Sequence, residues 1–527
     1  MREELFKSTE NQKNMKSKKF SRQFIMSLAP SDKFHGFQED SFCGYYIYVH
    51  SLLSFTKVDT KNVKALLLGY IIDPHHPHWQ DEDILLHICN NTQTVDDVPN
   101  LLYPLSGRFA LFVVINEQLF VFHDPCGFRT VTYAKTDEGL IFGSDEQIIC
   151  EVTALKKGEK FGEYEKSELK KAFENYIVAG VSLYEDVYKL VANHYLKVDT
   201  LTQIRYFPNK KIVKTTDIES VSDKSIEILI AEFSALKNRM HSFAFTVTAG
   251  RDSRLLMAFI DNSCKDVFYY TMSYWNVVNN HPDLRVPAEI LKKRKLQHHI
   301  LDCTCPSPVD FKEVYMKSST MAHPEWCDIA YGLDKCYPEE RLNVKGVASE
   351  IACCHYYSKG KKLMTDFVNH YTEFVDKMGE SLEGLLELSF NKKALKVWFE
   401  GVKNVQDNFA VSPFDLYLWE QRMSSWQAQS QLEWDITQET YAPFNNRELF
   451  DTMLALNNDC RIRKNNKLYK IIIEKQLPLL LEFSYDGGIT SKLVQNTKRI
   501  IRKTLQRLGI NTLRFRPRWK KQYRKEH

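Results

Sequence analysis

Several signatures of specialised protein classes are missing from this chain of 527 residues. Its 12 cysteines contain no CxxC pair, and the chain is far longer than the small secreted domains that disulfides hold together. Uninterrupted apolar runs, such as residues 110–115, are too short to span a bilayer. No internal repeat or low-complexity tract is visible. We therefore expect a cytoplasmic globular protein with free thiols and no transmembrane segment.

The chain also has no large excess of positive or negative residues. The chain has 71 Lys and Arg against 67 Asp and Glu, which gives a net charge of only +4. This balance argues against a protein whose whole surface is built to bind nucleic acid. Hydrophobic residues make up 43% of the chain, enough to form large cores, and the length predicts two domains.

Positive charge is concentrated at the C-terminal end, in residues 491–527. This basic tail combines Lys and Arg with Phe515, Trp519 and Tyr523. Such a composition is typical of a segment that binds RNA or an anionic membrane surface, and also of a solvated helix followed by a basic terminus. An anionic partner for the tail is therefore one of two open hypotheses.

Strand and helix patterns alternate in residues 62–149. Apolar runs at residues 65–73, 108–116 and 119–125 predict strands, and residues 81–90 predict a helix. The polar turn Asn116-Glu117-Gln118 predicts a hairpin between the last two strands. We expect an α+β layer in a first domain of residues 1–210. The boundary falls before a helix that Ser222 or Asp223 would cap.

The second domain, residues 211–490, shows a different pattern. Strands are predicted at residues 243–248, 266–274 and 298–303, with a helix from Asp252 and another at residues 287–295. This alternation predicts a parallel sheet with crossover helices. Residues 415–481 are expected to be mostly helical.

The turn TAGRDS, residues 248–253, joins the first of these strands to its helix. A strand that runs into a glycine turn and a helix presents free backbone N–H groups and the positive end of the helix dipole, which suit phosphate. The turn lacks both the GK[ST] tail of a Walker loop and the spaced glycines of a dinucleotide fingerprint. A plain helix cap is the alternative interpretation.

Residues 248–253 resemble the S-G-G-x-D-S pyrophosphate loop of the asparagine synthetase-like ATP pyrophosphatases. Residues 105–149 look like the glutaminase-type N-terminal half of that family, with matches at Asp124, Gly127, Arg129, Tyr133 and Ser144. The segment VKGVASEI, residues 344–351, resembles the second ATP-site segment S-G-E-G-x-D-E. Residues 442–456 and 466–478 resemble the C-terminal helical part.

The resemblance implies a fold and a reaction. The fold is an N-terminal Ntn-hydrolase-like αββα sandwich, followed by a parallel-sheet adenine nucleotide α-hydrolase-like domain with a helical C-terminal part. In that family a substrate carboxylate attacks the α-phosphate of ATP, and an amine then displaces AMP from the acyl-adenylate. The chain would therefore be an AMP-forming amide ligase with ATP and Mg²⁺ as cofactors.

The resemblance also implies residue roles. The turn amides and the Ser253 hydroxyl would hold pyrophosphate, and Asp252 and Glu350 would bind Mg²⁺. Glu350 is also a catalytic candidate, and Lys467 or Lys470 would stabilise the pentacoordinate phosphorus. The residues implied for ATP binding are Thr248, Ala249, Gly250, Arg251, Asp252, Ser253, Met272 and Gly346.

Two departures from the family pattern affect function. Amidotransferases of this type use a Cys directly after the initiator Met as nucleophile, whereas Arg2 follows Met1 here and the first cysteine is Cys43. We therefore expect no glutaminase activity, and the sequence around Cys43 predicts a strand with a buried thiol. Ser349 stands at the position that matches the Mg²⁺-binding Asp of the second segment.

Two other functions remain open. A non-catalytic scaffold would explain the loss of Asp at Ser349. A tRNA-modifying ATP pyrophosphatase would use the basic tail, although the absence of CxxC pairs argues against the sulfur-transferring members. The expected partners are a small-molecule, peptide or sugar carboxylate, an amine donor, and a second copy of the chain in a homodimer. His298, His299 and His355 lack ligand spacing and are expected to be core or solvated residues.

Overall fold

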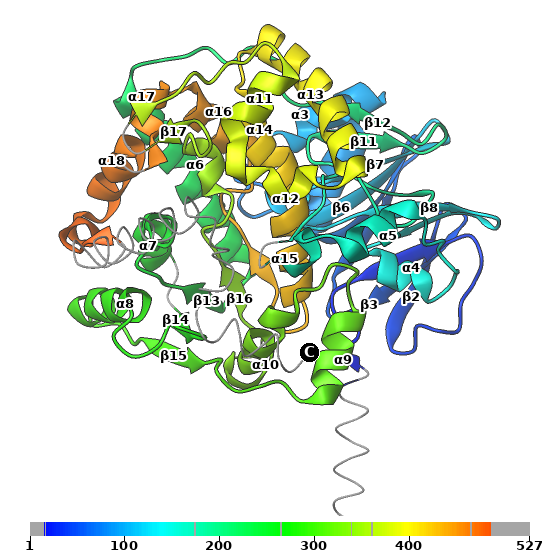
Figure 1. Cartoon of the computed structure of the whole chain (residues 1–527), viewed down its shortest axis with the longest axis horizontal. Helices are drawn as coiled ribbons and strands as arrows, with labels where there is room; N and C mark the ends of the chain where they lie inside the picture. The colour runs from blue at the N-terminus through cyan, green and yellow to red at the C-terminus, as the bar shows by residue number, and fades with distance from the viewer. Residues whose placement is uncertain are drawn as a thin grey trace, which may run out of the picture.

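The computed structural model describes residues 15, 17–172, 175–263, 266–338, 340–359, 362–463 and 466–485. The basic tail of residues 491–527 lies outside the described residues. Two six-stranded antiparallel sheets and a five-stranded parallel sheet organise the described chain, together with a two-stranded sheet of β17 (Ser358–Lys359) and β18 (Lys362–Leu363) (Figure 1). The domain limits 1–210 and 211–490 stay a prediction.

The two antiparallel sheets lie in the N-terminal part of the chain. One has the order β10-β8-β9-β1-β3-β2 and contains β1 (Phe24–Ser27), β2 (Phe37–Phe42), β3 (Tyr45–His50), β8 (Thr132–Thr136), β9 (Gly139–Gly143) and β10 (Val187–Lys189). The other has the order β12-β11-β7-β6-β5-β4 and contains β4 (Phe55–Asp59), β5 (Val63–Ile72), β6 (Ser106–Ile115), β7 (Gln118–His123), β11 (His194–Lys197) and β12 (Thr202–Arg205).

The two sheets and the helices outside them form four layers, because successive side chains of a strand point to opposite faces. Phe24 of β1 packs between the two sheets with residues such as Phe112 of β6. Its neighbour Ile25 points to the opposite face, as the period of two in a strand requires, and packs with Ile148 of α4 (Glu146–Cys150). On the far side of the second sheet, α2 (Asp81–Asn91) packs on β5. The predicted αββα sandwich is confirmed.

The predicted hairpin is confirmed too. It joins β6 and β7, and Asn116 and Glu117 have φ angles of 49° and 66°. Two successive left-handed residues match the twist of antiparallel strands. The shorter helices of this part are η1 (Val95–Asp97), α3 (Val98–Leu102), α5 (Glu159–Lys166) and η2 (Leu169–Lys171).

The predicted parallel sheet is confirmed, with the order β15-β14-β13-β16-β19 and every neighbouring pair parallel. Its strands are β13 (Phe243–Thr246), β14 (Val267–Ser273), β15 (His299–Asp302), β16 (Leu342–Val344) and β19 (Thr440–Tyr441). The helices along this part of the chain are α6 (Ile218–Arg239), α7 (Arg251–Ser263), α8 (Pro282–Lys293), α9 (Val309–Lys317), η3 (Pro324–Trp326) and α10 (Cys327–Cys336).

Two predicted helix starts were wrong. Helix α6 begins before Ser222, because the Asp217 carboxylate accepts the backbone N–H of Ser220 at 2.9 Å and caps the helix there. Helix α8 begins at Pro282 rather than at Pro287, and His281 caps it through the N–H of Asp283.

The described chain from residue 349 onward is mainly helical, as was predicted for residues 415–481. Its helices are η4 (Ser349–Ala352), α11 (Tyr371–Met378), η5 (Gly379–Ser381), α12 (Glu383–Leu386), α13 (Ser389–Phe409), α14 (Pro413–Leu416), the π-helix η6 (Tyr417–Gln427), α15 (Ala428–Trp434), α16 (Arg447–Ala455), α17 (Asn458–Arg461), α18 (Lys467–Gln476) and η8 (Pro478–Glu482). Within the described residues, no helix has the length and apolar character needed to cross a membrane.

Buried charges join the sandwich to the helical part. Arg108 of β6 donates to both carboxylate oxygens of Asp435, one of them at 2.7 Å, and all of these atoms are buried. Arg129 donates to Glu439 at 3.1 Å, and Arg22 lies 3.5 Å from the same carboxylate. We call the boundary between the sandwich and the helical part the seam. The seam cluster consists of Arg22, Arg108, Arg129, Asp435 and Glu439.

A second buried contact lies at the same seam. Glu232 of α6 accepts hydrogen bonds from the Tyr441 hydroxyl and, at 2.8 Å, from Asn446. The residue is fully buried, and this burial raises the pKa of its carboxyl to about 8. A neutral carboxyl therefore holds α6 against β19 and the start of α16.

The raised pKa of Glu232 predicts a pH-dependent stability. Because the folded pKa lies above the ordinary value of 4.5, the contribution to stability is complete below about pH 4.5 and is lost as the pH rises through 8. The wild type should therefore lose stability relative to Glu232→Gln by roughly 1.4 kcal/mol per pH unit between these values. Urea unfolding at several pH values measures this difference. The control is Glu227→Gln, an exposed site on the same helix, and equal pH slopes in all three proteins would contradict the assignment.

Candidate functional site

The candidate site lies where the strand order of the parallel sheet changes direction. From β13 the chain moves to β14 on one side of the sheet, and it later returns to β16 on the other side (Figure 1). In open parallel sheets, ligands bind in the crevice outside the carboxyl ends of the two strands at such a switch point. The segments that follow β13 and β16 are residues 247–253 and 345–350, which the sequence predicted to form one site.

These two segments are in close contact. A Cβ atom added to Gly346 would lie 2.9 Å from the backbone carbon of Asp252 and 3.0 Å from its carbonyl oxygen. The hydroxyl of Ser349 donates to Oδ1 of Asp252 at 2.6 Å. Only glycine lets the backbone of the second segment approach the start of α7 this closely.

The contact brings two acidic side chains together. Burial raises the pKa of Asp252, and the hydrogen bond from Ser349 and the charge of Arg463 oppose this rise. Burial, followed by the charge of Asp252, raises the pKa of Glu350 to about 7. Oε2 of Glu350 is buried without a hydrogen-bond partner in the described part of the chain. We call Asp252 and Glu350 the acid pair.

The acid pair offers oxygen donors of the kind that a magnesium ion takes. Mg²⁺ prefers oxygen ligands and is usually held by one or two carboxylates together with substrate phosphates. Across the described residues, no group of three or more His, Cys, Asp and Glu side chains could hold a metal ion by itself. Two carboxylates with an unpaired oxygen are therefore the donor set expected for a shared metal site.

The turn after β13 is held by short-range hydrogen bonds. The hydroxyls of Thr248 and Ser253 lie 3.0 Å apart, and the N–H of Gly250 donates to Oγ1 of Thr248 at 3.2 Å. The N–H of Ala249 donates to the carboxylate of Asp283 at 3.0 Å. The Asp283 carboxylate thus accepts the hydrogen bond of a turn N–H that the family resemblance assigns to pyrophosphate. The sequence analysis missed this residue, because it comes from the start of α8.

A buried arginine fixes the first turn of α7. Arg254 donates to the carbonyl oxygens of Phe483 and Ser484, each at 2.6 Å, and to that of Ala249 at 3.1 Å. The chain that follows η8 is thereby tied to the turn. Next to it, Arg251 lies partly buried with its guanidinium carbon 5.1 Å from the ring centre of Tyr485.

The two predicted lysines lie on the surface of the structure. Lys467 and Lys470 are exposed on α18, and neither side chain forms a hydrogen bond or ion pair with another described residue. The residue of α18 that contacts the site is Tyr469, whose hydroxyl donates to the carbonyl oxygen of Ser349 at 2.7 Å. The cation that acts on both acids is Arg463. Its only signal in the sequence is its place in a basic run before α18.

The remaining candidates lie around the same sheet. Met272 lies near the carboxyl end of β14, partly buried, and packs with the side chains around Leu301. His298 shares a hydrogen bond with Thr271 at 2.9 Å. Burial and the charge of Arg463 lower the pKa of His355 to about 3, so this histidine is neutral.

The prediction for Cys43 was wrong. Its thiol is exposed, because Cys43 and Gly44 form the turn between β2 and β3 with φ angles of 49° and 88°. The sequence suggested one continuous strand because apolar residues lie on both sides of the turn.

The comparisons with known proteins concern the fold alone. No protein-family model and no curated protein matches the chain. The NH3-dependent NAD synthetase from Campylobacter jejuni is 11% identical, with a TM-score of 0.21, over 39% of this chain and 92% of that one. Glutamine PRPP amidotransferase from B. subtilis, complexed with ADP and GMP, is 9% identical, with a TM-score of 0.24, over 60% and 92%. At these values the similarity does not bear on function.

The close approach of Gly346 to Asp252 predicts a local intolerance to side chains. Gly346→Ala should lower the free energy of unfolding by about 1–3 kcal/mol, because one of the two backbones must shift. The control is Gly401→Ala in α13, where a Cβ meets nothing within 4 Å, so the same change should stabilise the helix by about 0.5–1 kcal/mol. Denaturant unfolding measures both. Equal effects of the two substitutions would show that the segments are not in contact.

Proposed function

We propose that the chain is an ATP-dependent ligase of the asparagine synthetase-like type, which adenylates a carboxylate and transfers the acyl group to an amine. The observation that carries the proposal is the acid pair at the switch point of the parallel sheet, in contact with a glycine turn at the start of a helix. The resemblance of residues 248–253 and 344–351 to the two ATP-site segments supports it.

Each residue then has a chemical role. Asp252 and Glu350 would hold Mg²⁺, which when bound neutralises charge on the phosphates. The turn amides and the Ser253 hydroxyl would bind pyrophosphate once the Asp283 carboxylate has moved from Ala249. A substrate carboxylate oxygen attacks the α-phosphorus, the bond to the β-phosphate breaks and pyrophosphate leaves. The amine then attacks the acyl carbon, loses a proton and displaces AMP.

The N-terminal sandwich is proposed to lack glutaminase activity. The exposed Cys43 lies in a hairpin turn inside the chain, so it carries no α-amino group of its own. Glutamate release from glutamine by the purified protein is the measurement. Turnover that disappears in Cys43→Ala would overturn this part of the proposal.

Asp252→Ala should weaken the binding of Mg-ATP by about 1–3 kcal/mol, the scale of a lost charged contact. This corresponds to roughly a fivefold to 150-fold increase in Kd, measured by calorimetry. The matched control is Asp223→Ala, which removes an exposed carboxylate on α6 and should leave the Kd unchanged. Equal affinity of wild type and Asp252→Ala would show that the nucleotide site is wrongly placed.

Variants of the two α18 lysines test whether the chain is a ligase or only binds nucleotide. If Lys467 or Lys470 stabilises the transition state, replacing it with Met should cut ATP–pyrophosphate exchange roughly a hundredfold while the Kd for ATP stays nearly constant. Unchanged exchange in both single variants and the double variant would remove the lysines from the mechanism. Tight Mg-ATP binding without any exchange would favour the non-catalytic alternative.

A further inference from the structure

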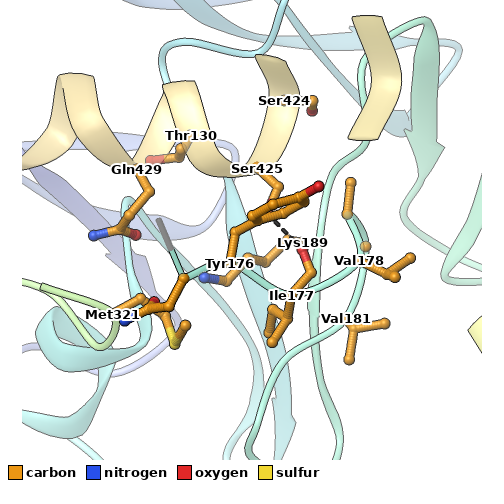
Figure 2. Close-up of a pocket in the computed structure, with 13 residues that line it drawn as sticks. Thr130, Tyr176, Ile177, Val178, Val181, Lys189, Met321, Ser424, Ser425 and Gln429 are labelled. Atoms are coloured by element: carbon orange, nitrogen blue, oxygen red, sulfur yellow. Dashed lines mark hydrogen bonds between the residues drawn. The ribbon is translucent and has the colours of Figure 1, made fainter. Parts of the chain in front are cut away.

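The cavity between residues 175–181 and the helical segment of η6 and α15 has room for about one water molecule. Its volume is about 30 Å³, which is the share of a single water in the liquid. Figure 2 shows the side chains that line it, from Tyr176 and Ile177 on one wall to Ser425 and Gln429 on the helical wall. It is therefore a gap in the packing rather than a binding site.

A larger groove lies on the N-terminal sandwich. Its volume of about 220 Å³ is the space of roughly seven water molecules, and it is open to solvent. Residues 27–33, which follow β1, form one wall. Thr136 and residues 138–141, at the hairpin of β8 and β9, form another, together with residues 152–153 after α4. None of these residues belongs to the proposed nucleotide site.

The groove exists because β1 and β9 separate. β1 pairs with β9 over two residues and leaves it after Met26, whereas β9 stays paired with β8 as far as Gly139. Beyond β1 the chain turns toward β3, on the other side of β1, where the Tyr48 hydroxyl accepts the N–H of Ser31 at 2.7 Å. The edge of β9 that β1 has left therefore faces the groove.

Leu140 presents its peptide groups to this gap. The N–H of Ser144 donates to the carbonyl oxygen of Phe24 at 3.0 Å. In an antiparallel pair, every second residue directs both its N–H and its C=O to the same neighbouring strand, and here these residues are Ser144, Phe142 and Leu140. Phe142 pairs with Met26, but Leu140 has no partner on the β1 side in the described part of the chain. One N–H and one C=O are thus left open toward the groove.

Two carboxylates determine the charge of the ligand that fits. Asp32 lines the groove from the loop after β1 and Glu138 from the hairpin turn, and both are exposed. Neither side chain forms a hydrogen bond or ion pair with another described residue. Lys33 also lines the groove, but its ammonium group donates to the carbonyl oxygen of Glu151 at 2.6 Å. The groove therefore favours a ligand with a positive charge.

The dimensions of a sheet limit this ligand to about one residue. With a rise of about 3.3 Å, a strand spacing of about 4.8 Å and a sheet spacing of about 10 Å, one strand residue takes up roughly 160 Å³. A groove of about 220 Å³ therefore holds one residue whose chain continues into solvent. The N-terminal residue of a peptide combines this size with a positive charge, N–H donors and a C=O acceptor.

We propose that this groove binds the N-terminal residue of a peptide. The ammonium group of the peptide donates to the C=O of Leu140 and to the carboxylates of Asp32 and Glu138, and its first carbonyl oxygen accepts the N–H of Leu140. Pairing with a sheet edge and capture of a terminal amine are both known modes of peptide recognition. The site stands whether or not the chain is a ligase, because none of its residues takes part in the proposed reaction.

Glycinamide, a minimal molecule with these groups, tests the site. At about pH 6.5 its amino group is protonated, since the pKa of an α-amino group is about 8. In protein labelled with ¹⁵N-leucine, the amide resonance assigned with Leu140→Ile should shift saturably with glycinamide hydrochloride. N-acetylglycinamide lacks the charge and methylammonium chloride lacks the carbonyl group, so each should bind at least about fivefold more weakly, the scale of one lost hydrogen bond.

Asp32→Asn combined with Glu138→Gln should weaken glycinamide binding at least about tenfold, because both negative charges are lost. The matched control is Asp137→Asn, which removes the neighbouring exposed carboxylate of the same hairpin turn, outside the groove lining, and should keep binding within about twofold. Resonances remote from the groove should stay at their wild-type positions in both proteins. The absence of a saturable shift of Leu140, equal binding of N-acetylglycinamide, or unchanged binding by the double variant would overturn the proposal.

Discussion

The seam cluster determines how the two halves of the molecule sit together. Arg108 and Asp435 are almost completely buried, and their ion pair crosses the seam. Removing one partner from a buried ion pair typically costs about 3–5 kcal/mol, because it leaves an uncompensated charge. The sandwich therefore holds the end of α15 and the start of β19 in place. The neutral carboxyl of Glu232 adds a second contact to the same strand.

The position of the seam has consequences for the proposed nucleotide site. β19 is the edge strand next to β16, so the contacts at the seam support the strand that is followed by Gly346 and Glu350. The π-helix η6 leads into α15. Its Gln421 and Ser425 side chains form hydrogen bonds with the backbone of Ala179 and Ile177.

Local patterns in the sequence were enough to predict most of the elements. The apolar runs of β5, β6 and β13 and the Asn116-Glu117 turn are local signals, so the sandwich and the parallel sheet could both be predicted. Helix starts were less predictable, because competing caps stand close together, as Asp217 and Ser222 do. The turn at Cys43 was missed because apolar residues on both sides concealed it.

The sequence by itself determined the glycine turn, Asp252, Glu350 and the alternation of strands and helices that brings them to one end of a sheet. Only the tertiary structure decided which charges act on them. Arg463 and Arg422 act on the acid pair, Lys467 and Lys470 remain exposed, and Asp283 occupies a turn amide. The reason is physical: a strand or turn is encoded by neighbours in sequence, whereas electrostatics depends on distance and burial, which residues from remote segments create together.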